Sequence, residues 1–564
     1  MKEMLDRLLY NGSIHTLKNE ADIVEALGIQ DGKIVFAGTD KEAFAHYDAR
    51  EAIDLGGKTV IPGLGDSHMH FYALCQALTT VDLGGCVSKA EAIARLRKKA
   101  AATPKGEWVR GSNFDQSKWA DSADQLPTRH DLDTASTEHP IVIKRACLHT
   151  AVANTAALEK AGIGKGYSPE PGGTAEFEAD GYPNGILREQ ATKVFDEIIP
   201  DPLINPACKR TIMVEQLQKM ASLGMTAMHT YAADIWKYTE SAEDYAALDR
   251  EGLLPLRVTV YQDKLEKLQD QPVTPSIMLD DPHTKAYVGG YKLFCDGSLG
   301  SRSAALYAPY ADDPSTTGIV VEDQDALEEK MLRASRAGIQ CAVHAIGDRA
   351  LDMVITAIEH TRSALLTEGW SQQQVDALPK FRIIHAQLAT PELIRRMRQL
   401  PVVLDIQPVF FLTDMHWVEE RLGPVRKKNG YLWHTYLAND LLLTGGSDAP
   451  VESYAPMPAI YSAVTRKDLS GWPDDGMQPE EKLSVYEALC LFSKNLPHAT
   501  CGSVSTGTLE AGKFADLAVL DRDIFTIPPE EILKVQVERT MLAGKDTWLR
   551  EPEANGDAGN GFEK

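Results

Sequence analysis

The middle of the chain alternates short apolar runs with amphipathic segments. The apolar runs are typical of buried strands, and in the segments between them apolar residues recur at helical spacing. One helix start is readable at Thr390-Pro391, where a capping residue precedes a proline at the first helical position. Strand, helix, strand, helix predicts a parallel sheet, and this many repeats predicts a closed (β/α)8 barrel. The alternating stretches are "YKLF", "DQDALEEKMLRASRAG", "IQCAVHAIGD", "RALDMVITAIEHTRSALL", "FRIIHAQ", "TPELIRRMRQL", "PVVLDIQPVFF" and "LLLTGGSDAPVE".

The two ends of the chain have a different pattern. Asn11-Gly12 and Asp31-Gly32 separate apolar runs near the N-terminus, and such dipeptides are typical of tight hairpin turns. Short apolar runs and turns return over residues 507–523 and 537–548. Because both ends share this texture, we expect them to pair into one small β-rich domain.

Polar residues stand where the predicted barrel strands end. His68 and His70 follow the apolar run that begins at Thr59, and the period of two along a strand puts both imidazoles on one face. Polar groups at the carboxyl ends of barrel strands converge on the face where such enzymes keep their chemistry. The strand-end residues are His68, His70, Lys292, His344, His385 and Asp448.

The spacing of these residues can be compared with a β/α unit of about 31 residues. His344 to His385 is 41 residues, and His385 to Asp448 is 63, close to one and two units. From His70 to Lys292 is 222 residues, whereas three units need only about 93. The excess predicts an insertion after the first barrel strand, before the next good strand runs.

These patterns predict the domain organisation. We expect a β-sandwich from residues 1–60 and 505–550, a barrel domain of residues 61–504 that contains an inserted region at 83–207, and a flexible tail at 551–564.

Composition and charge narrow the class of protein. The 564 residues carry a formal net charge of −23, which argues against nucleic acids and anionic membrane surfaces as partners. The N-terminus has no signal-peptide pattern, and no apolar run approaches the length of a membrane span. The eight cysteines form no CxxC pair, which favours reduced thiols and a cytoplasmic location.

Six motifs in this order resemble the amidohydrolase superfamily of metal-dependent hydrolases, and within it the amidohydrolase family 3 branch that includes N-substituted formamide deformylases. The resemblance spans nearly the whole chain. It implies a (β/α)8 barrel beside a small β-sandwich built from both chain ends. The motifs are "VIPGLGDSHMH", "YKLFCDGSLGSRSAALYAPY", "CAVHAIGDRA", "RIIHAQ", "GGSDAPVE" and "GTLEAGKFADLAVLD".

The resemblance also implies one or two divalent metals, usually Zn2+. By the matching motif positions, His68, His70 and Asp448 would bind the more buried metal, and His344 and His385 the second. Lys292 would be carboxylated by CO2, and its carbamate would bridge the two metals.

The expected chemistry is hydrolysis of a C–N bond, of amide or formamide type, in a small-molecule substrate. A coordinated water has its pKa lowered toward about 7, so a metal-activated hydroxide would attack. Asp448 would take the proton of the water and pass it to the leaving amine.

The sequence also departs from the pattern of the branch. Thr230 stands where the family commonly has an acid, and Glu189 matches a recurring acid that is a rival to Lys292 as the bridging group or a substrate-facing group. His149 and Asn154 match substrate-contacting positions of the branch, with a capping or hydrogen-bonding role as the alternative.

Three further residues are substrate-binding candidates from residue type and place alone. Trp119 and Phe410 are candidates to line an apolar pocket, with plain packing as the alternative. Arg302 is a candidate to hold a substrate carboxylate, with an ion pair to a carboxylate such as Asp296 as the alternative.

Two other functions stay open at this point. One is a mononuclear, deaminase-like enzyme in which Lys292 is uncarboxylated. The other is a non-catalytic binding protein on the same fold, which is disfavoured because every expected ligand is present. Pairing of two barrels into a homodimer is a further expectation, and the sequence does not identify the substrate.

Overall fold

A computed structural model describes residues 2–121, 125–145, 150–169, 172–232, 240–269, 281–500 and 505–551. The chain divides into two compact units. One consists of residues 1–72 together with 214–564, and the other of residues 73–213.

The first unit contains an eight-stranded, wholly parallel sheet in which neighbouring strands follow chain order. This sheet is a barrel, which confirms the predicted (β/α)8 fold class. Nearly all residues of these strands are buried, as expected for a parallel sheet that is covered on both faces. They are β8 (Leu64–Met69), β15 (Met225–Tyr231), β16 (Arg257–Gln262), β17 (Ala286–Phe294), β18 (Gln340–Ala345), β19 (Phe381–His385), β20 (Val402–Ile406) and β21 (Leu442–Gly445).

The first and last strands meet at a seam that is closed beyond their ends. The amide of Asp448 donates to the carbonyl of His68 over 2.7 Å, and the amide of His70 donates to the carbonyl of Ala449 over 2.7 Å. The seam therefore brings residues 68–70 and 448–449 together through the backbone.

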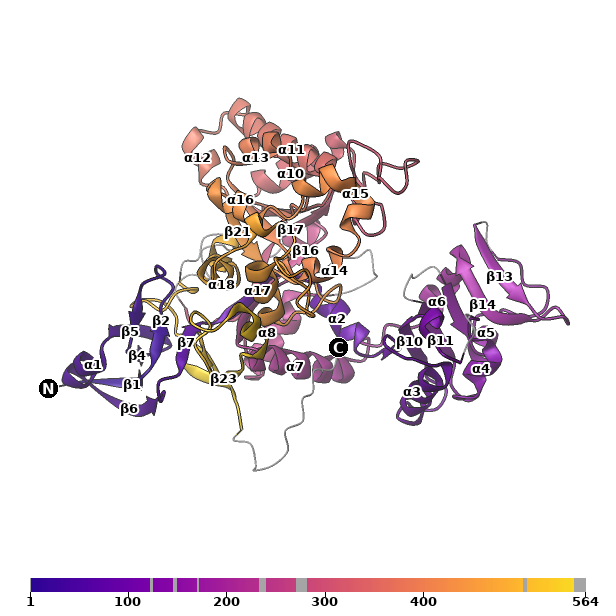
Figure 1. Cartoon of the computed structure of the whole chain (residues 1–564), viewed down its shortest axis with the longest axis horizontal. Coiled ribbons are helices and arrows are strands. Elements are labelled where there is room, and N and C mark those ends of the chain that lie inside the picture. The colour runs from indigo at the N-terminus through magenta and orange to yellow at the C-terminus, as the bar shows by residue number, and fades with distance from the viewer. Residues whose placement is uncertain are drawn as a thin grey trace. The chain divides into compact units, whose positions relative to one another are not determined.

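Helices cover the outside of the barrel, and α10, α11 and α13 lie side by side there (Figure 1). α10 begins after its capping residue Asp323 and buries Leu327, Met331 and Ala334 on one face, as its helical spacing predicts. The helices of this unit are α1 (Asp40–His46), α8 (Ala242–Arg250), α9 (Glu266–Gln269), α10 (Gln324–Arg336), α11 (Asp348–Thr367), α12 (Gln372–Asp376), α13 (Pro391–Met397), α14 (Phe411–Asp414), α15 (Val418–Arg426), α16 (Trp433–Ala438), α17 (Pro456–Thr465), α18 (Val485–Phe492) and α19 (Leu496–Ala499).

The two ends of the chain form two further sheets in the first unit. Their strand orders are β5-β4-β1-β6 and β24-β23-β22-β7-β2-β3, so the second sheet combines strands from both termini. Leu9, Ile34, Val60 and Leu517 share one apolar cluster between the sheets. The strands are β1 (Glu3–Tyr10), β2 (Ser13–His15), β3 (Ile23–Val24), β4 (Ala26–Gln30), β5 (Lys33–Gly38), β6 (Tyr47–Asp54), β7 (Thr59–Pro62), β22 (Leu517–Leu520), β23 (Val537–Leu542) and β24 (Lys545–Leu549).

The second unit has its own six-stranded sheet in the order β13-β14-β12-β11-β10-β9, with apolar clusters around Ile143 and around Leu187. Its strands are β9 (Val81–Asp82), β10 (Val109–Phe114), β11 (Ile141–Arg145), β12 (Thr150–Ala153), β13 (Gly173–Phe177) and β14 (Pro183–Glu189). Its helices are α3 (Lys89–Ala101), α4 (Arg129–Asp133), α5 (Thr155–Lys160) and α6 (Lys193–Ile198), and α2 (Phe71–Ala77) and α7 (Pro206–Ser222) run across the two boundaries between the units.

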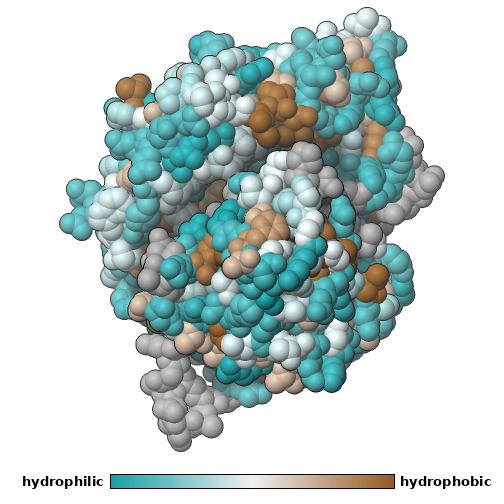
Figure 2. All heavy atoms as spheres, turned by 90° about the vertical axis from the view of Figure 1, so that its right-hand side faces the viewer, coloured by the Kyte–Doolittle hydropathy of each residue, from teal (hydrophilic) through white to brown (hydrophobic). Residues whose placement is uncertain are grey.

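The face of the molecule in Figure 2 is mainly hydrophilic, and its apolar side chains form small separate groups. Within the described ranges, none of the helices combines the length and the apolar character that crossing a membrane requires.

The close packing at the seam predicts that position 446 does not tolerate a residue larger than glycine. A Cβ on Gly446 would lie 2.7 Å from the backbone nitrogen of His68 and 3.0 Å from Asp66 Oδ1, and backbone atoms cannot move aside cheaply. We expect Gly446→Ala to lower the free energy of unfolding by about 2 kcal/mol or more, measured by urea denaturation. Gly164→Ala is the control, because a Cβ there meets only one ring atom at 3.9 Å. Equal urea midpoints for Gly446→Ala and the unsubstituted protein would contradict the close approach at the seam.

Candidate metal centre

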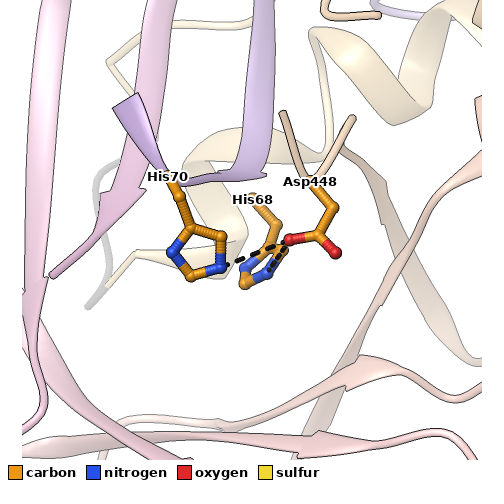
Figure 3. Close-up of side chains that lie close together, drawn as sticks. All are labelled: His68, His70 and Asp448. Carbon is orange, nitrogen blue, oxygen red and sulfur yellow. Dashed lines mark ion pairs between the residues drawn. The ribbon is translucent and has the colours of Figure 1, made fainter. Parts of the chain in front are cut away.

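Three candidate ligands meet at the barrel seam. His68 Nε2 lies 3.0 Å and His70 Nε2 lies 3.3 Å from Asp448 Oδ1, and all three side chains are buried (Figure 3). One donor atom from each lies within 4.8 Å of the others, and within the described ranges no other set of three His, Cys, Asp or Glu residues does so. The period of two along β8 places both imidazoles on the same side, as the sequence predicted.

A second pair of histidines ends β18 and β19. His344 Nδ1 lies 3.0 Å from His385 Nε2, and the ring of His385 is 5.4 Å from the ring of His68, centroid to centroid. Five of the six predicted ligands, the four histidines and Asp448, thus come together at the carboxyl end of the barrel.

Hydrogen bonds to the outer ring nitrogens fix which nitrogen of His344 and His385 carries hydrogen. His344 Nε2 donates to the carbonyl of Gly297 over 3.1 Å. His385 Nδ1 faces Gln407 Oε1 at 2.7 Å, and the Gln407 amide is oriented because its nitrogen donates to the carbonyl of Asp405. Both rings therefore donate outward, and their remaining nitrogens face each other with lone pairs.

Two facing lone pairs 3.0 Å apart repel each other unless a cation or a proton lies between them. Burial lowers the pKa of His385 to about 4 and lowers the pKa of His344 well below its ordinary value, so neither ring holds an extra proton at neutral pH. Outer hydrogen bonds of this kind orient histidines toward metals. The residues therefore fit a divalent cation.

The ring of His68 has no such outer hydrogen bond: its Nδ1 has no partner in the described part of the chain, and its Nε2 faces Asp448. The pKa of His68 lies well below the ordinary value, mainly because the ring is buried. The nearby Lys292 lowers it further. The ring packs against Tyr231, 4.3 Å away centroid to centroid. His70 differs, because its Nδ1 donates to the carbonyl of Tyr231 over 2.9 Å.

Lys292 projects from β17 and is 1% exposed. Its Nζ has no hydrogen-bond partner among the described residues, and it lies 4.8 Å and 4.7 Å from the ring centroids of Tyr231 and Phe294. Burial lowers the pKa of Lys292 to about 7, so the uncharged amine is present near neutral pH. An uncharged amine is the nucleophilic form of lysine.

The backbone is strained at two of the candidate ligands. His385 and Asp448 have φ of 73° and 58°, a left-handed conformation that costs non-glycine residues of order 1–2 kcal/mol. Asp66 Oδ1 supports the turn before Asp448 by accepting from the amides of His68 and Ser447 over 2.9 and 3.1 Å. Strain held in this way is typical of functional sites.

Two of the substrate-binding candidates lie in the barrel unit. The ring of Phe410 stacks on His385 at 5.9 Å between centroids. Arg302 pairs with Asp312 at 2.9 Å, which supports the ion-pair alternative with a different carboxylate, and Asp296 accepts backbone amides. A small pocket, with room for about one water molecule, adjoins the site and is lined by His385, Gln387, Gln407, Phe410, Tyr431 and Trp433.

The other candidates lie in the unit of residues 73–213. The side chain of Asn154 forms hydrogen bonds with four backbone groups and caps α5, which supports the capping alternative. Trp119 is buried beside Phe114 in an apolar cluster, which supports packing. Glu189 ends β14 with φ of 53°, and its bridging role stays a prediction. His149 lies outside the described residues.

Several residues of the site were missed in the sequence. Gln407 directly follows β20, a strand for which no polar residue at the carboxyl end had been predicted. Asp66 stands two positions before His68, and this spacing on a strand was an available signal. Thr230 stands where the family commonly has an acid, and its Oγ1 donates to Glu240 over 2.9 Å. Glu240 therefore supplies a carboxylate next to that position.

A (β/α)8 barrel whose strand ends gather buried histidines, an aspartate and a lysine defines a metal-dependent hydrolase. Residues 51–547 match the amidohydrolase family, and the chain belongs to that family. It is 31% identical to YtcJ of Bacillus subtilis, over 95% of this chain and 98% of the relative. It is 28% identical to an N-substituted formamide deformylase of Arthrobacter pascens, over 96% and 98%.

Among solved structures, the chain is similar to an uncharacterized metal-dependent hydrolase of Pyrococcus horikoshii, with a TM-score of 0.74 and 29% identity. The similarity covers 93% of this chain and 99% of that one.

The buried amine predicts an unusual effect on stability. We expect Lys292→Met to raise the free energy of unfolding of chelator-treated protein by about 1–3 kcal/mol, because it removes a buried polar atom without a partner. Lys285→Met is the control, since Lys285 Nζ donates to the carbonyl of Leu254 and pairs with Asp249. Urea denaturation measures both, and a less stable Lys292→Met protein would show that the amine is satisfied in the metal-free fold.

Proposed function

We propose that this protein hydrolyses a C–N bond, of amide or formamide type, in a small-molecule substrate. The observation that carries the proposal is the pair of facing lone pairs on His344 and His385, 3.0 Å apart in a buried site beside the His68–His70–Asp448 cluster. The similarity to an N-substituted formamide deformylase over nearly the whole chain supports the choice of bond.

The donor set suggests how metals would be held. Imidazole nitrogens and a carboxylate oxygen are ligands that Zn2+ prefers. His68, His70 and Asp448 would hold one cation, and His344 and His385 a second. A divalent cation in this site supplies Lewis acidity, which activates water and polarises the scissile carbonyl.

Lys292 would connect the two positions as a carbamate. Its uncharged amine attacks the carbon of CO2 and releases a proton, which leaves an anionic group with two oxygens. Support comes from burial, from the missing hydrogen-bond partner and from the lowered pKa, all of which disfavour an ammonium group at this place.

Asp448 is the residue placed to move the proton. The attacking water adds to the carbonyl carbon, its proton passes to the carboxylate of Asp448, and the carboxylate delivers it to the nitrogen as the C–N bond breaks. The products are a carboxylic acid and an amine. The ring of Phe410, which stacks on His385, offers an apolar contact for the rest of the substrate.

The metal ligands are tested by a double substitution. We expect His68→Ala/His70→Ala to lower bound zinc, measured by elemental analysis, and to lower kcat/KM by about a thousandfold or more, because the Lewis acid is lost. His360→Ala is the control, since His360 lies on α11 and pairs with Glu328 on the exposed side. Full activity in the double variant would overturn the proposed function. About two zinc ions per chain would support the bridged site, whereas one would support the mononuclear alternative.

The bond type is tested by a substrate screen. We expect zinc-loaded protein to release amine from N-formyl or N-acyl amines, or to open cyclic amides, with amine formation followed by a colorimetric assay. Esters and phosphoesters of matched size are the comparison. Hydrolysis confined to esters or phosphoesters would contradict a C–N hydrolase while leaving the metal site intact.

A further inference from the structure

A fully buried guanidinium lies inside the barrel below the candidate metal ligands. Arg382 on β19 is 0% exposed, and each of its five N–H groups has a partner. Two donate to the carboxylate of Asp405, both over 2.7 Å. The others reach His229 Nδ1 at 3.0 Å, the hydroxyl of Tyr261 at 2.7 Å and the carbonyl of Ser67 at 2.7 Å.

The contact with Ser67 reaches the strand that carries the metal ligands. The peptide between Ser67 and His68 is held at both of its polar atoms: Arg382 donates to its oxygen, and its N–H donates to Asp66 Oδ1 over 2.9 Å. Because a peptide unit is planar, hydrogen bonds at its oxygen and its nitrogen restrict the rotation of the whole unit, which carries the Cα of His68. The hydroxyl of Tyr231 adds a longer contact of 3.4 Å to the same oxygen.

His68 needs this backbone support more than the other histidines do. His70, His344 and His385 are each oriented by a hydrogen bond on the outer ring nitrogen, and the ring of His68 has none in the described part of the chain. Its orientation depends on its peptide plane and on packing against Tyr231.

We propose that Arg382 is the positioning residue of the metal centre, and that it orients His68 through the carbonyl of Ser67. Arg382 does not touch the metal or the substrate. It is itself held in one place by Asp405, which also accepts from Thr444, and by Tyr261, which donates to Gln340 over 2.6 Å. With His229 on β15, the network thus joins six strands, β15, β16, β18, β19, β20 and β21, to the carbonyl on β8.

A lysine cannot replace Arg382 in this role. Its single ammonium has three donors around one atom, whereas the guanidinium spans the carboxylate of Asp405 and the carbonyl of Ser67 with a rigid, planar fork. Arg382→Lys therefore keeps the charge and removes the geometry.

The test compares Arg382→Lys with Arg257→Lys. Arg257 is also buried, pairs with both oxygens of Asp516 over 2.7 and 3.1 Å, and donates to two carbonyls, but it contacts none of the candidate ligands. Zn2+ is titrated into chelator-stripped full-length protein, and urea midpoints are measured in parallel. We expect both variants to lose stability, and only Arg382→Lys to lose Zn2+ affinity, by about 10- to 100-fold.

The inference rests on the proposed metal site, and the two can fail separately. If the unsubstituted protein binds no Zn2+, the proposed function fails. If it binds Zn2+ and Arg382→Lys binds equally tightly, only the positioning role is overturned. Should Arg382→Lys not fold, Tyr261→Phe decides, because it removes one acceptor of the guanidinium and leaves β8 untouched. A lower Zn2+ affinity in Tyr261→Phe supports the role, and an unchanged affinity overturns it.

Discussion

The site depends on one electrostatic constraint: two imidazole lone pairs face each other in a buried place with no proton between them. His344 Nδ1 and His385 Nε2 face each other at 3.0 Å, and the outward hydrogen bonds of both rings leave no tautomer that would relieve the repulsion. Protonation is opposed by burial, which lowers the pKa of both rings. A positive ion is the remaining way to satisfy these atoms, so metal binding follows from the packing of the barrel itself.

The barrel imposes this constraint through its seam. Parallel strands end at one face, and the closing hydrogen bonds between His68 and Asp448 bring the first and the last strand within reach of one cation. The left-handed conformations of His385 and Asp448 are the local cost of turning the chain into the site. The surrounding network holds these conformations, since Asp66 ties the two ends of the seam together.

The sequence predicted the barrel and its strand-end residues because both depend on short-range periodicity, which a single chain displays. The period of two identifies the shared face of His68 and His70, and the apolar runs identify the strands. The domain boundaries stay predictions. Residues whose roles depend on partners far away in the chain could not be found in this way. Gln407 resembles any amide at a strand end, and the contacts of Arg382 are known only from its hydrogen-bond partners in the folded chain.

The presence of the buried ion pair between Arg382 and Asp405 is not explained by protein stability alone. Burying two charges costs several kcal/mol of desolvation for each, and replacing such a pair by apolar residues is often neutral or stabilising. A net gain in stability is therefore a weak reason for a charge pair in the middle of a barrel that apolar side chains could fill. Directional hydrogen bonding is a stronger reason for the pair. A fixed array of donors can hold a carbonyl on one strand relative to a carboxylate on another. The contacts of Arg382 with Asp405 and with the carbonyl of Ser67 are therefore better explained by directional hydrogen bonding than by a gain in stability.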